Sequence, residues 1–209
     1  GIDVVIHLAA RVHVMNEIDP KPLSAFRRVN VGITRQLALA SVQSNVRRFI
    51  FISSIKVNGD TTNFNKPFKP ELCSARYQSL KNASKKKLVP KEIDSYALSK
   101  FEAEQDLEDI CKNNSMELVI IRPPLIYGNG VGGNFEKMMQ WIHAKKLIPF
   151  GGIKNQRSFV YIDNLVSLIE QCIIHPNAGN QTFLVSDGKD LSTDEVFRIL
   201  SSTLSEKAR

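Results

Sequence analysis

The stretch GIDVVIHLAA, residues 1–10, is almost entirely apolar and rich in β-branched valine and isoleucine. A continuous apolar run of this kind is typical of a strand that is buried on both faces, as in a parallel sheet. No helix and no initiating methionine precede it in the sequence. A buried strand at the start of a chain looks like the middle of a fold, so we expect the chain to lack the part that comes before it.

Apolar strands then alternate with amphipathic helices along the chain. Three further apolar runs, at 47–52, 117–121 and 181–185, predict strands. Helical spacing of apolar residues predicts helices over 26–40, 95–111, 135–142, 165–172 and 196–200, the last preceded by a capping box at Ser192 and Glu195. This alternation predicts an α/β fold with a Rossmann-like parallel sheet. Because ligands bind at the carboxyl ends of such strands, the residues after Ala10, Ile52 and Ile121 are the candidates for a site.

Composition excludes several classes of protein. The 209 residues are 43% apolar and 23% charged, which excludes a disordered or fibrous chain. No apolar run approaches the ~18 residues that a membrane-spanning helix needs. The three cysteines, Cys73, Cys111 and Cys172, are odd in number and far apart, and the four histidines are scattered. This pattern predicts no disulfide framework and no metal site, and it indicates a cytoplasmic protein.

Most of the formal net charge of +7 comes from one segment, which we call the basic stretch, residues 76–91. It holds six lysines and arginines and no acidic residue. Such a stretch can bind phosphate or nucleic acid, or it can be a solvated insertion. We favour the insertion, and expect no nucleic-acid partner, because aromatic residues do not alternate with the lysines as they do in a single-strand stacking surface.

The pattern Tyr-x-x-x-Lys occurs twice, at Tyr77 with Lys81 and at Tyr96 with Lys100. On a helix this spacing places the phenol and the ammonium on one face, where the lysine can lower the tyrosine pKa and produce a base. The first pair lies in the basic stretch and is interpreted as exposed. The second pair opens a predicted helix just after Asp94, a suitable N-cap residue, and is the candidate for catalysis.

Other strand ends complete the set of motifs. In chain order the motifs are His7-Leu8-Ala9-Ala10, Val29-Asn30-Val31 with Thr34, Ser53-Ser54-x-x-Val57-x-Gly59, Tyr96-x-x-x-Lys100, Arg122-Pro123-x-x-x-Tyr127-Gly128 and Arg157-x-Phe159-Val160-x-x-Asp163. With these motifs the chain resembles the extended short-chain dehydrogenase/reductase family, in particular its NAD-dependent nucleotide-sugar epimerase, dehydratase and 4-ketoreductase branch. The resemblance covers nearly the whole chain.

The resemblance also implies a division of the chain. The family opens with a glycine-rich turn that holds the dinucleotide pyrophosphate, and this turn is not in the sequence. The glycines at 128, 130 and 133 match the pattern G-x-G-x-x-G, but no acidic residue ends a second strand about 20 residues later, so we place that loop near the sugar nucleotide. We expect residues 1–130 to form the second half of an NAD(P)-binding Rossmann domain. Residues 131–209 are expected to be mainly a substrate-binding part, with a returning strand near 181–186.

The resemblance implies a role for individual residues. Tyr96 is expected to be the general base for a sugar hydroxyl, Lys100 to lower its pKa and hold the nicotinamide ribose, and Ser54 to orient the hydroxyl. The other residues expected at the cofactor, NAD or NADP, are Leu8, Ala9, Ala10, Asn30 and Pro123. The other residues expected at the UDP-sugar are Lys56, Asn134, Phe135, Phe150 and Arg157. Ser53 is expected to be structural.

The implied activity is transfer of a hydride between C4 of a UDP-hexose and NAD(P). Both a UDP-glucose 4-epimerase-like reaction and reduction of a UDP-4-keto-6-deoxy-hexosamine, as in formation of UDP-N-acetylquinovosamine, remain open. A catalytically silent Rossmann-like binding or regulatory protein is the alternative. Ile55 and Lys56 stand where 4,6-dehydratases of the family carry an acid pair, which argues against dehydration.

Two further expectations concern the assembly of the protein. In this family the helices that carry Asn30 and Tyr96 pack against their copies, so we expect a homodimer. Phe101, Leu107 and Cys111 either supply an apolar face for this dimer or face the sheet, and both alternatives remain open. The 209-residue chain by itself is expected to be inactive. The strand over residues 4–8 is expected at an open sheet edge, covered by a rearranged N-terminus or by another chain, or else causing poor solubility.

Overall fold

The computed structural model describes residues 1–12, 22–63, 66–71, 94–130, 135–136, 139–140 and 155–207. The basic stretch, with Tyr77 and Lys81, lies outside the described residues, as do Asn134 and Phe150. The chain divides into two compact units. Unit 1 comprises Gly1–Pro123 and Leu168–Leu184, and unit 2 comprises Pro124–Ser167 and Val185–Arg209.

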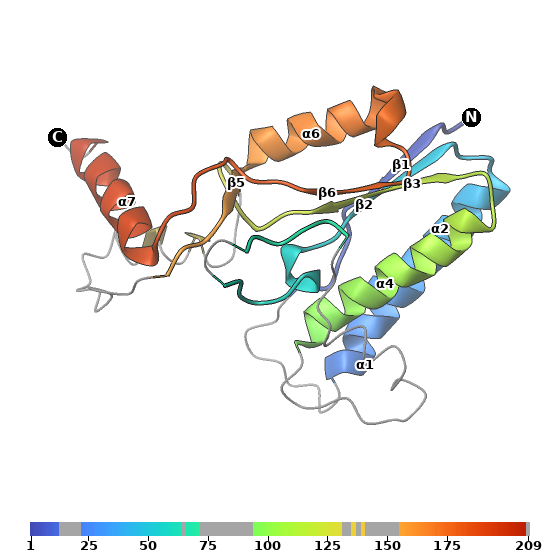
Figure 1. The fold of residues 1–209 in the computed structure, drawn as a ribbon, viewed down its shortest axis with the longest axis horizontal. Coiled ribbons are helices and arrows are strands. Elements are labelled where there is room, and N and C mark those ends of the chain that lie inside the picture. The colour runs from blue at the N-terminus through green and yellow to red at the C-terminus, as the bar shows by residue number, and fades with distance from the viewer. Residues whose placement is uncertain are drawn as a thin grey trace. The chain divides into compact units, whose positions relative to one another are not determined.

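Unit 1 is built on a four-stranded parallel sheet in the order β1-β2-β3-β6 (Figure 1). The strands are β1 (Val4–His7), β2 (Arg48–Ile52), β3 (Glu117–Arg122) and β6 (Gln181–Leu184). In register, Ile6 lies opposite Ile50, and Ile50 lies opposite Val119. Every residue of β2 is buried, as expected for an apolar strand covered on both faces. The predicted parallel α/β sheet is therefore confirmed, and β6 is a returning strand within the range predicted for one.

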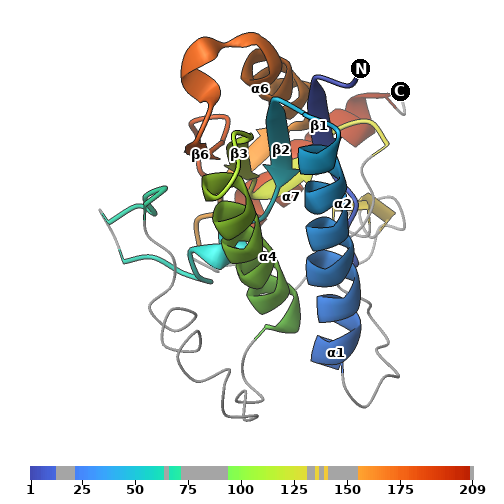
Figure 2. The same ribbon diagram turned by 90° about the vertical axis from the view of Figure 1, so that its right-hand side faces the viewer.

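One face of this sheet is covered by a continuous helical segment and by a second helix. The segment consists of α1 (Pro22–Phe26), the π-helical η1 (Arg27–Ile33) and α2 (Thr34–Gln43). Beside it lies α4 (Ser95–Lys112), and Figures 1 and 2 show the two side by side. Alternate residues of the strands point toward these helices, so Phe49, Phe51 and Ile120 join Leu107 in one apolar core.

The helix face considered for contact with a second copy of the chain points into this core instead. Phe101, Leu107 and Cys111 are all buried within unit 1, and Leu107 and Cys111 belong to the core cluster. Of the two alternatives, the dimer face is wrong. The reason is that α4 packs against both the sheet and α2, so two of its sides are apolar and helical spacing alone does not separate them.

The opposite face of the sheet carries the carboxyl-terminal part of α6 (Ile162–Ile174), which belongs to unit 1 from Leu168 onward (Figure 1). Arg48 of β2 holds the end of this helix. Its Nη1 donates hydrogen bonds to the carbonyl oxygens of Cys172 at 2.6 Å and His175 at 3.0 Å, while its Nε donates to Glu117 at 2.7 Å. The last carbonyls of a helix lack partners within the helix, so a buried arginine satisfies them and complements the helix dipole. The short 3-10 helix η3 (Pro176–Ala178) follows.

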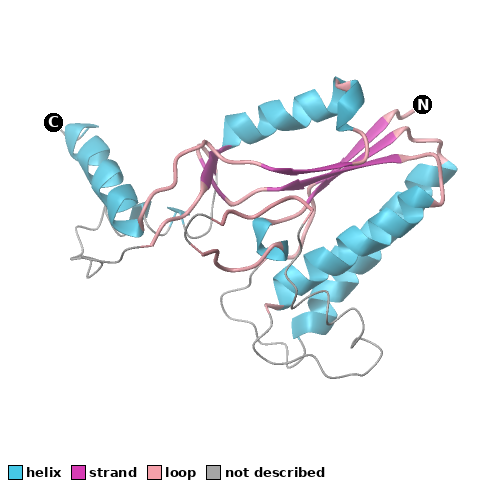
Figure 3. Cartoon of the chain, viewed as in Figure 1, coloured by secondary structure: helices cyan, strands magenta, loops and turns pink. Residues whose placement is uncertain are grey.

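Unit 2 contains a second, smaller sheet. Its strands β4 (Leu125–Tyr127) and β5 (Phe159–Tyr161) pair in parallel, and Figure 3 shows them among the loops of this unit. The last helix is α7 (Thr193–Lys207). Its predicted capping box is confirmed, because Glu195 accepts a hydrogen bond from the Ser192 N–H at 2.7 Å and its own N–H donates to Ser192 Oγ at 3.1 Å. Of the helix predicted over 135–142, residues 135–136 and 139–140 are described, and they are helical.

The first strand lies at an edge of the unit 1 sheet. β1 pairs with β2 on one side, and on the other side it meets no strand in the part of the chain that the structure describes. Ile2 and Leu8, which flank it, are exposed by 64% and 61%. The rearranged N-terminus that we considered as a cover for this edge is not seen among the described residues.

The described residues contain neither a membrane-spanning helix nor a cluster of metal-binding side chains. Within them, no helix is both long and apolar enough to cross a membrane. No group of three or more histidine, cysteine, aspartate or glutamate side chains in the same residues could hold a metal ion.

The hydrogen bonds from Arg48 to the carboxyl end of α6 give a stability prediction. Arg48→Met keeps the apolar stem but removes the buried donor from the helix carbonyls and leaves Glu117 with only the half-exposed Arg47. The free energy of unfolding is therefore expected to fall by about 2–4 kcal/mol. Urea denaturation measures this change. The matched control is Arg47→Met, because Arg47 also contacts Glu117 and Ile173 but its side chain is 50% exposed against 1% for Arg48. We expect the control to lose less than about 1 kcal/mol. Equal losses in the two variants would contradict the account.

Candidate active site

The loop that follows β2 is tied to the end of β3. The Ser53 N–H donates to the Ile121 carbonyl at 2.7 Å, and the Ile55 N–H donates to the Pro123 carbonyl at 3.0 Å. Ser54 then caps the short 3-10 helix η2 (Ile55–Val57), with its Oγ accepting from the Lys56 N–H at 3.3 Å. These bonds hold Ser54 at the carboxyl edge of the sheet, where the sequence predicted a site.

Tyr96 lies in the first turn of α4, next to the N-cap residue. Asp94 Oδ1 accepts hydrogen bonds from the N–H groups of Tyr96 at 2.9 Å and Ala97 at 3.2 Å. The ring of Phe26 from α1 packs edge-on against the Tyr96 ring, with centroids 6.3 Å apart. A hydrogen bond joins the Tyr96 side chain to Ser54. The structure therefore brings together Ser54 and Tyr96, which are 42 positions apart in the sequence.

Lys100 lies one helical turn further along α4 and is buried. Its Nζ sits over the ring of Phe51, 4.1 Å from the centroid, which is a cation–π contact. Burial lowers the pKa of Lys100 to about 8, although the nearby Glu104 carboxylate acts in the opposite direction. The ammonium thus lies against an aromatic face, and the Glu104 carboxylate favours its charged form.

The pKa of Tyr96 departs from the expectation. Burial raises it above the ordinary value for tyrosine, the hydrogen bond with Ser54 acts to lower it, and the charge of Asp94 raises it further. The prediction that the pKa is lowered is therefore wrong for this structure. The spacing Tyr-x-x-x-Lys indicated where the charge of Lys100 lies, but it carried no information about how deeply the phenol is buried.

A buried ion pair fixes α4 against the end of β3. Arg122 Nε donates to Glu104 Oε1 at 2.9 Å, and Arg122 Nη2 donates to Glu104 Oε2 at 2.7 Å. Both side chains are almost fully buried. The remaining Nη1 of Arg122 donates to Asn58 Oδ1 and to the Pro70 carbonyl, each at 3.1 Å. A single guanidinium therefore connects α4, β3 and the segment that follows η2.

Asn30 braces the backbone after β1, as the family resemblance implied. Its Oδ1 accepts from the Arg11 N–H at 2.7 Å, and its Nδ2 donates to the Arg11 carbonyl at 3.0 Å and to Ser99 Oγ at 2.9 Å. Because Ser99 is on α4, Asn30 couples the end of β1 to the helix that carries Tyr96. Direct contact of Asn30 with a cofactor stays a prediction.

His7 belongs to this buried polar cluster, although the sequence gave it no role. Its Nε2 lies 2.8 Å from Thr34 Oγ1, and its ring stacks on Phe51 with centroids 5.7 Å apart. Burial, and secondarily the charge of Lys100, lowers the pKa of His7. The signal that could have indicated this is the occurrence of His7 and Thr34 in two of the quoted motifs.

Four residues predicted at a cofactor follow the carboxyl ends of β1 and β3, the two strands that flank β2. Leu8, Ala9 and Ala10 directly follow β1, and Pro123 directly follows β3. At the end of β2 the hydroxyl of Ser53 is buried and has no hydrogen-bond partner among the described residues. A buried polar group without a partner suits a polar ligand, so this donor set fits a group that presents hydrogen-bonding atoms at the sheet edge.

One predicted sugar-nucleotide residue of unit 2, Phe135, lies beside a hydrogen-bonded cluster around Asp187, which sequence analysis missed. The carboxylate of Asp187 accepts hydrogen bonds from Tyr127 OH at 2.8 Å, from the Tyr161 N–H at 3.1 Å and from Asn164 Nδ2 at 2.8 Å. The Phe135 ring packs on Tyr127, with centroids 5.7 Å apart. In the sequence, only the polar run at residues 186–190, after the last predicted strand, indicated this cluster.

Arg157 lies elsewhere in unit 2. Its backbone pairs with Leu191 in an isolated antiparallel bridge, with N–H to O distances of 3.0 Å in both directions, and the residue is exposed. No ion pair involving its side chain is found among the described residues. The guanidinium is therefore accessible, as a phosphate-binding arginine would need to be.

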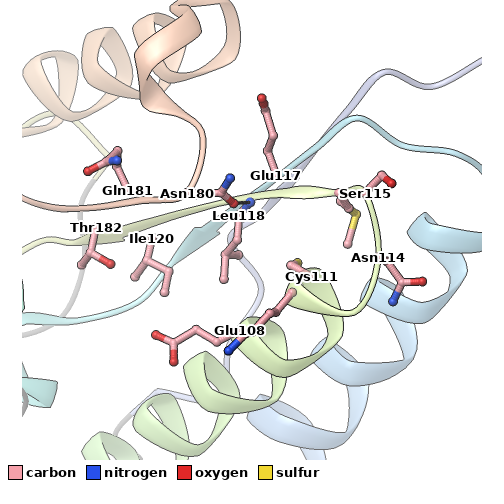
Figure 4. A pocket seen from close by; sticks show the side chains of 12 residues that line it. Glu108, Cys111, Asn114, Ser115, Glu117, Leu118, Ile120, Asn180, Gln181 and Thr182 are labelled. Atoms are coloured by element: carbon pink, nitrogen blue, oxygen red, sulfur yellow. Dashed lines mark hydrogen bonds between the residues drawn. The ribbon is translucent and has the colours of Figure 1, made fainter.

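A hollow of about 610 Å³ opens at the other end of the unit 1 sheet. Figure 4 shows that its lining side chains come from the last turns of α4 and the starts of β3 and β6, among them Glu108, Glu117 and Thr182. None of the predicted site residues lines it. The hollow is thus separate from the cluster around Tyr96.

Comparison with known proteins identifies relatives over nearly the whole chain. A UDP-glucose 4-epimerase from Vibrio cholerae is 48% identical over 202 residues, which are 96% of this chain and 57% of that protein. An N-acetyl-alpha-D-glucosaminyl-diphospho-ditrans,octacis-undecaprenol 4-epimerase from Escherichia coli O157:H7 is 27% identical over 212 residues, 99% of this chain and 56% of that protein. The chain therefore spans little more than half the length of these relatives.

Solved structures share the fold. A UDP-glucuronic acid 4-epimerase from Bacillus cereus, in complex with UDP-glucuronic acid and NAD, superposes with a TM-score of 0.78 at 21% identity, covering 98% of this chain and 60% of that one. A UDP-glucose 4-epimerase from Thermotoga maritima with UDP-glucose gives 0.74 at 20% identity, covering 97% and 61%.

The match to a family model includes every element of unit 1. The model of the NAD dependent epimerase/dehydratase family matches residues 1–186. That range contains Ser54, Tyr96 and Lys100 as well as both sheets. This chain belongs to the NAD dependent epimerase/dehydratase family.

Proposed function

We propose that the protein containing this chain interconverts UDP-hexoses at C4, as a UDP-glucose 4-epimerase-like enzyme that uses NAD or NADP. The observation that carries the proposal is the convergence of Ser54, Tyr96 and Lys100 at the carboxyl edge of the unit 1 sheet. The 48% identity to a UDP-glucose 4-epimerase supports the choice of epimerisation. Reduction of a 4-keto sugar uses the same three residues and is the second candidate, favoured only by the Ser-Ser-Ile-Lys-Val-Asn-Gly run at 53–59.

Each residue has a distinct task in this mechanism. Tyr96 takes the proton from the C4 hydroxyl of the sugar and later returns it, as a general base and then a general acid. Ser54, already hydrogen-bonded to Tyr96, holds that hydroxyl in line with the phenol. Lys100 keeps a buried positive charge one helical turn from Tyr96, where its ammonium can donate a hydrogen bond to a ribose hydroxyl.

The strand ends of unit 1 fit the nicotinamide end of a dinucleotide. The Ser53 hydroxyl and the Lys100 ammonium offer polar contacts, and Leu8, Ala9, Ala10, Asn30 and Pro123 are the other residues that we assign to this contact. A nicotinamide dinucleotide bound there supplies the acceptor and donor of hydride, and in its oxidised form a positive charge. In unit 2, Phe135 and Arg157 are assigned to the sugar nucleotide, together with Asn134 and Phe150, which lie outside the described residues.

A catalytically silent binding or regulatory protein is the competing function. It requires no proton-transfer group, whereas this chain holds a phenol, a hydroxyl and a buried ammonium within one cluster. Burying the Lys100 ammonium costs free energy, and a protein that only binds a ligand has no use for a buried charge beside a phenol. The arrangement therefore favours an enzyme.

We further propose a cytoplasmic homodimer. The two cysteines in the described part of the chain are free and buried, which suits a reducing compartment. Two apolar side chains remain exposed on the helical segment, Ile33 on η1 and Leu39 on α2. They replace Phe101, Leu107 and Cys111 as the candidates for an apolar contact between two copies.

The role of Tyr96 gives the first test of this function. Tyr96→Phe in the full-length protein removes the proton-transfer oxygen and leaves the ring, so kcat is expected to fall at least ~10²-fold with little change in thermal unfolding. Turnover is measured with UDP-glucose and UDP-N-acetylglucosamine. The matched control is Tyr77→Phe, in the other copy of Tyr-x-x-x-Lys, which should keep its activity. Wild-type turnover in the Tyr96 variant would remove Tyr96 from the mechanism.

A second test concerns the reaction that relatives of this family also perform. A dTDP-D-glucose 4,6-dehydratase from Dictyostelium discoideum is 26% identical to the chain. Dehydration needs protons moved at C5 and C6, and Ile55 and Lys56 offer no carboxyl group there. Incubation with UDP-glucose or dTDP-glucose should give no 4-keto-6-deoxy product by mass spectrometry, and detection of that product would overturn the proposed reaction.

The homodimer is tested by sedimentation. The full-length protein is expected to sediment as a dimer at micromolar concentration. Ile33→Glu combined with Leu39→Glu should shift it to a monomer, because the dimer would have to bury two unpaired charges in each copy. Val166→Glu is the control, since Val166 on α6 is similarly exposed but outside the helical segment. A monomeric wild type, or dissociation by the control alone, would contradict the proposed interface.

A further inference from the structure

One charged pair links the two sides of the Ser54–Tyr96 contact. The Lys56 ammonium forms an ion pair with Asp94 Oδ2, the oxygen that is not used in capping α4. The Lys56 N–H donates to Ser54 Oγ, and Asp94 Oδ1 accepts from the Tyr96 N–H. Lys56 thus connects to Ser54 through its backbone and, through Asp94, to the first turn of the helix that carries Tyr96.

The negative charge of this pair also acts on the phenol. The Asp94 carboxylate acts to raise the pKa of Tyr96, in addition to the larger effect of burial. Burial also acts to raise the pKa of Asp94, but its hydrogen bond and ion pair with Lys56, with two backbone N–H groups, hold it below the ordinary value. Asp94 is therefore a carboxylate at neutral pH, and Lys56 compensates its charge.

We propose that Lys56 and Asp94 are positioning residues, which hold Ser54 against Tyr96 and set the net charge beside the phenol. The inference rests on the proposed function, because it takes Tyr96 as the proton-transfer group. It assigns to Lys56 a role different from the substrate contact expected from sequence. Neither residue touches the reacting atoms in this account, since both act through Ser54 and Tyr96.

Other charged groups lie near this end of α4, and the variants proposed below do not alter them. They come from the segment around β1, from η1 and from α4 itself, and among the described residues they are His7, Arg11, Arg27, Lys100, Glu102 and Glu104. Arg27 is paired with Glu102, and Glu104 is paired with Arg122. Lys56 and Asp94 are thus the pair through which the charge beside Tyr96 can be altered with least disturbance.

Two variants are expected to act in opposite directions. Lys56→Met leaves the Asp94 carboxylate uncompensated, so the pKa of Tyr96 rises and kcat/KM below that pKa falls about three- to tenfold. Asp94→Asn keeps an N-cap side chain but leaves the Lys56 ammonium uncompensated, so the pKa of Tyr96 falls. The double variant returns it toward the wild-type value, and Lys56→Arg restores the pair. Damage to the fold alone would not produce shifts of opposite sign.

The measurement is made on the full-length protein by two routes. Tyrosine labelled with ¹³C at Cζ reports the Tyr96 titration, with the resonance assigned by its loss in Tyr96→Phe and folding followed by circular dichroism. The acid limb of the kcat/KM profile with UDP-glucose reports the same group in turnover. Arg198→Met is the matched control, because it removes the exposed Arg198–Asp194 ion pair of α7 and should shift neither readout.

The outcomes separate this inference from the proposed function. Shifts of opposite sign in the two single variants, with the KM for UDP-glucose within about twofold of wild type, support it. Shifts of the same sign, no shift, or a rise in KM alone would overturn it, and the last result would return Lys56 to the substrate contact. If the wild type does not convert any UDP-sugar, the proposed function fails while the NMR titration still decides whether the pair sets the charge beside Tyr96.

Discussion

The bidentate ion pair between Glu104 and Arg122 is the interaction on which the rest of unit 1 depends. It joins the middle of α4 to the carboxyl end of β3, and the same guanidinium reaches Asn58 just after η2. A buried ion pair of this kind is costly to break, because removal of either partner leaves an uncompensated charge in the core. The register of α4 against the sheet, and with it the position of Tyr96 and Lys100, follows from this contact.

Further hydrogen bonds at the carboxyl edge of the unit 1 sheet reinforce the position of α4. Asn30 couples α4 to the segment after β1, and the backbone of Ser53 and Ile55 couples the loop after β2 to β3. Three strand ends and one helix are thereby held to one another by hydrogen bonds, with Lys100 enclosed between them. Such rigid support is what a proton-transfer site requires, since a misplacement of about 1 Å reduces catalysis strongly.

Local patterns predicted the elements of this fold because each depends on neighbouring residues. The apolar run at 4–8 and the capping box at Ser192 and Glu195 are examples, and both were found as expected. The motif Tyr96-x-x-x-Lys100 likewise predicted the helix position of the two side chains. The pairing of Ser54 with Tyr96 was expected only because the family resemblance joined motifs that are far apart.

Features that depend on distant partners were not predictable from the pattern. Arg48 appeared to be an ordinary strand residue, yet it holds carbonyl oxygens 124 and 127 positions later. Asp187 joins three residues of unit 2 that lie 23 to 60 positions earlier. The raised pKa of Tyr96 and the inward face of Phe101 both follow from burial, which helical spacing does not reveal.

The central claim is reversible hydride transfer at C4 of a UDP-hexose, and one isotope experiment tests it most directly. UDP-glucose deuterated at C4 is incubated with the full-length protein and NAD, and the products are analysed by NMR. The account predicts UDP-galactose that retains the deuterium at C4, with no net formation of reduced cofactor, because the same hydride is removed and returned. Loss of the deuterium to solvent, accumulation of a 4-keto sugar with stoichiometric NADH, or no inversion at C4 for any UDP-hexose tested would contradict it.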